Sequence, residues 1–170
     1  MSRVAVATLT LSDTRQSADD SGGALLGELL REAGFEVASH QIVREEVDAI
    51  RAAVRALAAD PAVDAVVTTG GTGLAPRDQT LAALEPLFER EMVGFGEAFR
   101  RLSWDQIGAR AVLSNAFAGV VDGTIVAALP GSLKAIRLGV TQLITPMLAH
   151  AVDIAQGRTS HGPRPEVPAE

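Results

Sequence analysis

The sequence predicts an α/β protein of three layers, in which a mostly parallel sheet has helices on both faces. Short apolar runs rich in Val, Leu and Thr alternate with segments whose apolar residues recur at helical spacing. This alternation favours parallel strands joined by right-handed crossovers. With 170 residues, of which 47% are hydrophobic, the chain is long enough for one domain with a substantial core.

The first part of the chain alternates strand and helix with clear boundaries. Leucines recur at helical spacing from residue 25 to 30, and Gly34 follows as glycine often does beyond a helix end. Asp60-Pro61 is expected to stop the second helix. The predicted elements are a strand over 4–11, a helix over 25–33, a strand over Glu36–Val43, a helix over 47–57 and a strand over 62–69.

The second part of the chain is richer in helix. The predicted elements are helices over 79–90 and 95–103, a short strand over 111–113, a strand over Thr124–Leu129 and a long helix from Leu133 almost to Gly157. Pro146 should kink or divide the long helix, because proline lacks the N–H that the helix needs there. Residues 1–157 are therefore expected to form a single domain, and the tail 158–170, with several prolines, is expected to be extended or mobile.

Composition excludes several classes of site and partner. The chain has no cysteine, so disulfides, thiolate zinc sites and cysteine nucleophiles are excluded. Its net charge is −6 and it has no long basic run, so nucleic acid is not an expected partner. We see neither a signal peptide nor an apolar stretch long enough to span a membrane, and we therefore expect a soluble, cytoplasmic protein.

The most informative stretch is a glycine-rich turn between the strand at 62–69 and the following helix. It contains Gly70, Gly71, Thr72 and Gly73, and its bare backbone N–H groups could hold an anion. Alternatively, the glycines only allow a tight turn with positive φ. The spacing is neither that of a Walker loop nor that of the dinucleotide fingerprint.

Arg77 and Asp78 follow this turn directly. Arg77 adds a fixed positive charge, and Asp78 adds an oxygen ligand of the kind that Mg²⁺ prefers. Asp78 could equally cap the helix that begins near Gln79. Phosphate donors, a cation and a metal ligand so close together indicate phosphate or nucleotide chemistry.

Three predicted strand exits carry polar or glycine-rich turns, at 12–15, 70–73 and 130–132. The carboxyl ends of parallel strands meet at one edge of an open α/β sheet, where ligands bind. We therefore expect these turns to form a single site.

Other residues are candidates with ordinary structural alternatives. Asp13, beside Ser12, could be a ligand or an Asx-turn residue, and Glu45 could favour the positive end of the second helix. Ser132, in Pro130-Gly131-Ser132, reads first as a helix N-cap.

The same turn, with Lys134, could present free N–H groups and a positive charge to a phosphate. Ser114 and Asn115 precede Gly119 in a predicted loop, where hydroxyl and amide could bind a polar ligand. His40, His150 and His161 have no metal-ligand spacing and are expected to be structural or solvated.

In order and spacing, these motifs resemble the MoaB/MogA family of molybdenum-cofactor biosynthesis, and specifically its MoaB-like branch. The resemblance runs from about residue 4 to residue 151. Its marks are Thr10-Leu11-Ser12-Asp13-Thr14, Thr69-Gly70-Gly71-Thr72-Gly73, Arg77-Asp78-Gln79-Thr80, Gly94-Phe95-Gly96-Glu97, Leu113-Ser114 and Pro130-Gly131-Ser132.

The resemblance implies a compact α/β domain that forms trimers or hexamers and binds molybdopterin. Active members use Mg-ATP to adenylylate the terminal phosphate of molybdopterin and release pyrophosphate. By position, Asp78 matches an acid used in metal-assisted chemistry, and residues 70–73 match the nucleotide or pterin-phosphate loop. Ser114 matches a serine of the pterin-binding segment, and residues 130–132 match a phosphate-facing turn.

Two residues depart from the family pattern. Glu45 replaces an aspartate before the second helix, and Asn115 replaces the arginine of a Leu-Ser-Arg motif. The first hypothesis is an adenylyltransferase, in which Asp78 and Glu45 hold Mg²⁺ while Arg77 and Lys134 offset charge on the leaving pyrophosphate. The alternative, motivated by the two departures, is a non-catalytic molybdopterin-binding or carrier oligomer. An apolar set around the 95–103 helix is expected to include subunit-interface residues: Phe95, Phe99, Leu102 and Trp104.

Overall fold

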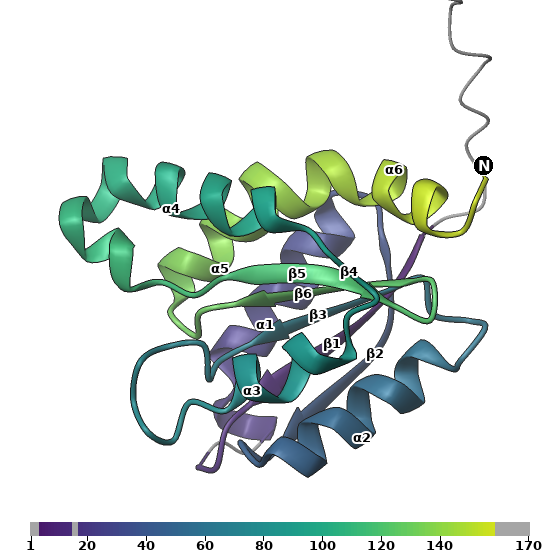
Figure 1. Ribbon diagram of the computed structural model, residues 1–170, viewed down its shortest axis with the longest axis horizontal. Coiled ribbons are helices and arrows are strands. Elements are labelled where there is room, and N and C mark those ends of the chain that lie inside the picture. The colour runs from purple at the N-terminus through teal and green to yellow at the C-terminus, as the bar shows by residue number, and fades with distance from the viewer. Residues whose placement is uncertain (1–3, 15–16, 159–170) are drawn as a thin grey trace, which may run out of the picture.

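A six-stranded, mostly parallel sheet forms the centre of the protein in a computed structural model that describes residues 4–14 and 17–158. The strand order is β2-β1-β3-β6-β5-β4 (Figure 1). The strands are β1 (Ala5–Leu11), β2 (Glu36–Val43), β3 (Ala65–Thr69), β4 (Arg90–Glu91), β5 (Phe117–Val121) and β6 (Thr124–Leu129). The first four in spatial order are parallel, whereas β5 runs antiparallel to β6 and β4 antiparallel to β5.

Helices cover both faces of this sheet, which confirms the predicted fold class (Figure 1). On one face lie α1 (Ser21–Glu32), α4 (Val93–Ile107), α5 (Leu133–Gly139) and α6 (Thr145–Ala155). On the other lie α2 (Val47–Ala58) and α3 (Thr80–Leu84). Short 3₁₀ segments occupy Ser17–Asp19, Glu85–Leu87 and Gly108–Leu113, and a π-helical segment occupies Val140–Ile144.

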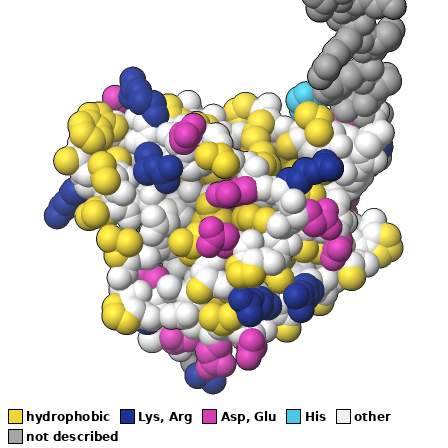
Figure 2. All heavy atoms as spheres, viewed as in Figure 1, with side chains coloured by type: hydrophobic (Ala, Val, Ile, Leu, Met, Phe, Trp, Pro, Cys, Tyr) yellow, Lys and Arg dark blue, Asp and Glu magenta, His cyan; other side chains and the backbone are white. Residues whose placement is uncertain are grey.

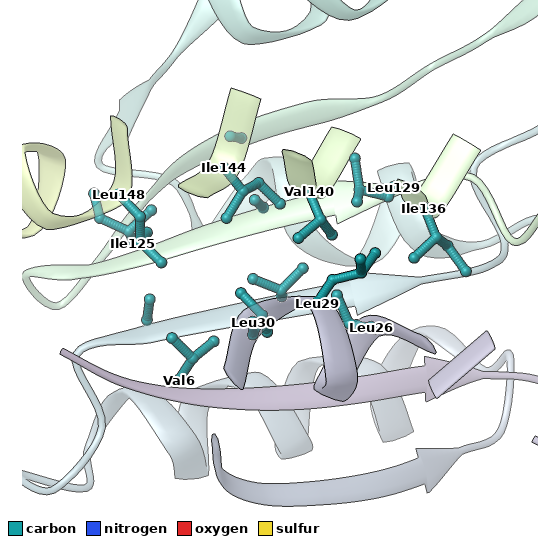
Figure 3. Close-up of a cluster of buried hydrophobic side chains, with 14 of the residues drawn as sticks. Val6, Leu26, Leu29, Leu30, Ile125, Leu129, Ile136, Val140, Ile144 and Leu148 are labelled. Atoms are coloured by element: carbon teal, nitrogen blue, oxygen red, sulfur yellow. The ribbon is translucent and has the colours of Figure 1, made fainter. Parts of the chain in front are cut away.

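Alternation along the strands divides the core into two layers, because successive strand side chains point to opposite faces. In β3, Ala65 and Val67 face the α1 side, whereas Val66 faces α2. Figure 3 shows the larger layer, in which Leu30 of α1 and Ile144 of the π segment meet the sheet. Both side chains are fully buried.

Some predicted boundaries move for local reasons. The third strand begins at Ala65 instead of residue 62, because Asp60 closes a turn first. Its carboxylate accepts a hydrogen bond from the Ala62 amide at 2.9 Å. The helix predicted over 79–90 ends at Leu84, because Pro86 lies in the 3₁₀ turn Glu85–Leu87, and residues 90–91 then pair with β5.

The strand predicted over 111–113 is wrong. Gly108, with φ of 59°, ends α4, and the chain continues as the 3₁₀ helix Gly108–Leu113. The strand that the prediction missed is β5, which joins β6 through the two-residue turn Asp122-Gly123. Both turn residues have positive φ, as a tight hairpin requires.

The long helix is divided near Pro146, as predicted, and a π segment lies just before this proline. The continuous stretch Leu133–Ala155 is, within the described residues, the one helix long and apolar enough to span a membrane by length and composition. This corrects the expectation that the chain has no such stretch. Residues of its inner face pack in the core, among them Ile136, Val140 and Leu148, which accounts for much of its apolar character.

The apolar set expected to include subunit-interface residues is mostly directed inward. Phe95 and Phe99 of α4 are buried in the core of their own chain, and Leu102 packs against it. Trp104 is 51% exposed. The aromatic content of α4 is therefore largely explained within one chain.

Candidate functional site

An open cavity of about 510 Å³ lies at the carboxyl edge of the parallel strands. The three predicted strand exits meet there, as expected from the topology. Twelve of the predicted site residues line it: Ser12, Asp13, Glu45, Gly70, Gly71, Thr72, Gly73, Arg77, Asp78, Ser114, Pro130 and Gly131.

The glycine-rich turn requires its glycines. Gly70 and Gly71 have φ values of 105° and 62°, a region that side chains disfavour. A Cβ on Gly71 would also lie 2.5 Å from Glu45 Oε1. The turn is fixed by Thr80, whose hydroxyl donates to the Gly70 carbonyl at 2.9 Å and whose amide donates to the Gly71 carbonyl at 3.1 Å.

The same turn leaves backbone donors free. Within the described part of the chain, the amides of Gly71, Thr72 and Gly73 have no hydrogen-bond acceptor. Gly71 is half-buried and Thr72 is buried, whereas Gly73 is exposed. Amides in buried positions are normally paired, so a cavity that presents several free amides is suited to an anion. The glycines therefore serve the tight turn, and anion binding by its free amides stays a prediction.

Asp78 does not cap the helix that follows it. The N-cap of α3 is Gln79, which makes no side-chain capping bond. Instead, Asp78 Oδ2 accepts a hydrogen bond from the Ala75 amide at 2.8 Å within the loop. A Cβ on Gly73 would lie 2.6 Å from this oxygen, so the carboxylate rests on the glycine-rich turn.

Glu45 and Asp13 join Asp78 in an acidic wall. Asp13 Oδ1 accepts a hydrogen bond from the Glu45 amide at 3.0 Å, which ties the exits of β1 and β2 together. Burial raises the pKa of Glu45, and the negative charges of Asp78 and Asp13 raise it further. The positive charge of Arg77 acts in the opposite direction on the same pKa.

The donor set fits Mg²⁺ that arrives with phosphates. Asp78 and Glu45 offer hard oxygen atoms beside free amides. Among the described residues, no group of three or more His, Cys, Asp or Glu is arranged to hold a metal ion. Proteins commonly bind Mg²⁺ through one or two carboxylates, with substrate phosphates and waters as the other ligands.

The opposite wall comes from the segment between α4 and β5. Ser114 Oγ is buried and has no hydrogen-bond partner within the described residues, and Arg100 Nη1 donates to the Ser114 carbonyl at 3.3 Å. Arg110 also lines this wall, and the sequence prediction missed it. The available signal was a basic residue four positions before Ser114, but a strand at 111–113 would not have brought it to the cavity.

Four predicted site residues do not line the cavity. Ser132 is the N-cap of α5, where its Oγ accepts from the Ala135 amide at 3.2 Å, and Asn115 lies just beyond the lining residue Ser114. Lys134 lines a different hollow. Gly119 lies inside β5 and not in a loop, and a Cβ there would lie 2.4 Å from the Phe88 ring.

His40 has a structural role, as predicted. Its Nε2 lies 2.9 Å from Asp20 Oδ2, and its Nδ1 lies 2.8 Å from the Thr8 hydroxyl. Asp20 also caps α1 by accepting from the Gly23 amide at 2.8 Å. Burial favours a higher pKa for Asp20, but the neighbouring Thr10 hydroxyl, the hydrogen bonds with Gly23 and His40, and the charge of His40 hold that pKa below its usual value. His161 lies outside the described residues.

Comparison with known proteins gives consistent matches. A family model described as "Probable molybdopterin binding domain" matches residues 7–150. The molybdenum cofactor biosynthesis protein B of Bacillus subtilis is 46% identical over 145 residues, which cover 85% of each chain. A crystal structure of a molybdenum cofactor biosynthesis protein B has a TM-score of 0.89 at 41% identity, covering 92% of this chain and 98% of that one.

A further solved structure is the tungsten cofactor synthesizing protein MoaB from Pyrococcus furiosus. It has a TM-score of 0.78 at 31% identity and covers 91% of this chain and 98% of its own. These matches confirm the resemblance that the motifs predicted. The chain therefore belongs to the MoaB/MogA family of molybdenum cofactor biosynthesis proteins.

Proposed function

We propose that this protein binds molybdopterin and adenylylates its terminal phosphate with Mg-ATP. Family membership supports a role in molybdenum cofactor biosynthesis. The observation that carries the finer proposal is the cavity itself, where the carboxylates of Asp78 and Glu45 adjoin the free amides of residues 71–73.

The reaction needs positioning and charge stabilisation. A terminal phosphate oxygen of molybdopterin attacks the α-phosphorus of ATP, and the bond from that phosphorus to the bridging oxygen of the β-phosphate breaks. Pyrophosphate leaves with the electron pair, so no nucleophile from the protein is required. The amides of residues 71–73 hold phosphate oxygens, and Arg77 offsets their negative charge. Lys134 has no place in this scheme, because it does not line the cavity.

Asp78 and Glu45 are the residues that would hold Mg²⁺. The ion would neutralise charge on the transferring phosphates. Glu45 lies over Gly71 and Asp78 lies over Gly73, so both carboxylates flank the free amides of the turn. This arrangement favours a phosphate chain along the turn with the metal on its acidic side.

The carrier function is the second candidate, because Glu45 has one more methylene than the family's aspartate and Mg²⁺ tolerates distorted geometry poorly. A carrier would hold or deliver molybdopterin without transferring AMP. Calorimetry separates the two functions: tight molybdopterin binding without Mg-ATP binding favours the carrier, whereas measurable Mg-ATP affinity counts against it.

Replacement of Asp78 by Asn tests the proposed chemistry. We expect Asp78→Asn to lower molybdopterin-dependent pyrophosphate release by about 100-fold or more, as loss of a charge-stabilising group does, while molybdopterin binding is retained. Asp105→Asn is the control, because Asp105 pairs with Arg101 on the surface of α4 outside this cavity. Wild-type turnover in Asp78→Asn would contradict the assignment of this residue.

The proposal includes a cytoplasmic homotrimer or homohexamer, as the family resemblance implied. Apolar side chains remain exposed where α4 ends and the next segment begins: Trp104, Ile107, Val112 and Leu113. Figure 2 shows hydrophobic atoms gathered over this end of α4. These exposed apolar side chains form a surface suited to association, and they support an assembly of more than one chain.

A further inference from the structure

The two walls of the cavity carry opposite charge. Glu45 and Asp13 follow β2 and β1 at one end of the sheet edge, and the glycine-rich turn follows β3 in the middle. The Ser114 wall lies at the other end, because β5 is antiparallel and begins beside the carboxyl end of β6. Three strand spacings of ~4.8 Å separate β1 from β5, so the backbones that carry Asp13 and the Ser114 segment stand roughly 15 Å apart.

Arg110 places an unpaired positive charge on the second wall. It is exposed on the segment Gly108–Leu113, and within the described residues it makes neither an ion pair nor a hydrogen bond. An arginine with no protein partner keeps its whole set of donors for a ligand, and its planar group suits bidentate binding of phosphate.

Ser114 gives an independent indication of a ligand on the same wall. Its hydroxyl is buried and has no hydrogen-bond partner, which costs free energy unless a ligand oxygen accepts a hydrogen bond from it. Arg100 donates a hydrogen bond to the Ser114 carbonyl, which fixes the backbone that carries the hydroxyl. A buried free hydroxyl and a free guanidinium on one short segment together describe a site for an oxyanion.

We propose that Arg110 is a specificity-determining residue that binds the terminal phosphate of the acceptor pterin. The Ser114 hydroxyl donates a hydrogen bond to the same phosphate. This inference rests on the proposed function. It assigns the acidic wall to the metal-nucleotide and the Arg110 wall to an anion that binds without metal. The glycine-rich turn lies between the walls, so a phosphate held by Arg110 faces the nucleotide phosphates held on the turn.

The test compares molybdopterin with dephosphorylated molybdopterin by anaerobic calorimetry, with EDTA present and ATP absent. We expect Arg110→Ala to weaken molybdopterin binding by about tenfold or more, as loss of a charge-assisted pair does, and to leave the dephosphorylated ligand within about twofold. Arg110→Lys should recover part of the loss because it restores the charge without the bidentate donors. Arg101→Ala is the control, because Arg101 is paired with Asp105 on the surface.

A second readout uses the complete reaction. With Mg-ATP present, Arg110→Ala should raise KM for molybdopterin and leave KM for ATP unchanged, because the nucleotide lies on the other wall. Asp78→Asn should show the opposite pattern, with reduced turnover and retained molybdopterin affinity.

The outcomes separate this inference from the proposed function. Equal weakening of both ligands in Arg110→Ala would assign Arg110 a structural role and overturn the inference. Unchanged binding of molybdopterin would do the same while the proposed function stands. A wild-type protein that binds neither ligand would overturn the proposed function and this inference with it.

Discussion

The ionised carboxylate of Glu45, a residue of the candidate site, lowers the stability of the folded protein. Burial and two neighbouring carboxylates raise its pKa, so its ionised form is less stable in the folded chain than in the unfolded one. The contribution of Glu45 to stability is complete below the unfolded pKa and declines as pH rises through the higher folded pKa. The folded protein at neutral pH therefore holds a charge that a bound cation would relieve.

We predict that Glu45→Gln raises the free energy of unfolding at pH 7.5 by up to about 1 kcal/mol, kept small by solvent screening, and gives no gain at pH 4. Urea unfolding at both pH values measures the difference. Glu46→Gln is the matched control, because Glu46 is exposed and paired with Arg44 at 3.1 Å. Pyrophosphate release should fall in Glu45→Gln alone. A less stable Glu45→Gln at pH 7.5 would show that the carboxylate is not strained.

At the scale of single residues, the predicted positions meet in one cavity where chemistry and spacing coincided. The glycines, Arg77 and Asp78 occupy one short stretch, and the stretch alone indicated a phosphate site. Arg110 could not be found in this way, because it reaches the cavity through a 3₁₀ segment that has no sequence period. It brings a guanidinium to the cavity, which Asn115 does not line.

Within α4, two glycines near its beginning have different surroundings. A Cβ on Gly96 would lie 2.7 Å from the Ala116 carbonyl oxygen, which is backbone and cannot turn aside. A Cβ on Gly94 would meet nothing within 4 Å. Gly96 therefore allows α4 to lie close to the chain that leads from Ser114 into β5.

We predict that Gly96→Ala lowers the free energy of unfolding by about 1–3 kcal/mol, because the added methyl overpacks this contact. Gly94→Ala, in the same helix, should be neutral or stabilising by up to about 1 kcal/mol, because alanine has the higher helix propensity. Chemical denaturation of both variants measures the contrast. Equal effects of the two substitutions would mean that α4 and Ala116 are not in close contact.

Element prediction was accurate where patterns were strong and local. Glu36–Val43 and Thr124–Leu129 were predicted to the residue, because turn signals bound both segments. β5 was missed because Ala118 and Gly119 interrupt any apolar alternation, although Asp122-Gly123 is a hairpin signal. β4 was missed because two residues form a strand only through a partner elsewhere in the chain.

For the whole molecule, the negative net charge opposes the anion binding proposed for the cavity. The net charge is −6, and Figure 2 shows basic side chains interspersed with acidic ones on the face in view. A global negative charge repels anionic substrates at long range. Salt screens this repulsion at distances beyond about 10 Å. The free amides and the arginines of the cavity act below that distance.

We predict a trimer or hexamer at micromolar concentration, measured by multi-angle light scattering. The physical reason is the exposure of apolar side chains beside the cavity, with Val112 65% and Leu113 57% exposed in the single chain. The mass should stay constant as salt is raised, because apolar association is not screened. A monomer throughout the micromolar range would contradict this prediction.

The antiparallel course of β5 also affects how such a protein can diverge. β5 begins at the edge of the sheet where the ligand site lies. The wall that carries Arg110 and Ser114 therefore belongs to the connection between α4 and β5, and not to a crossover of the parallel core. Insertions or substitutions in that connection can remodel recognition of the acceptor while the strand pairings that set the glycine-rich turn persist. Selection could thus retune which pterin is accepted without rebuilding the nucleotide half.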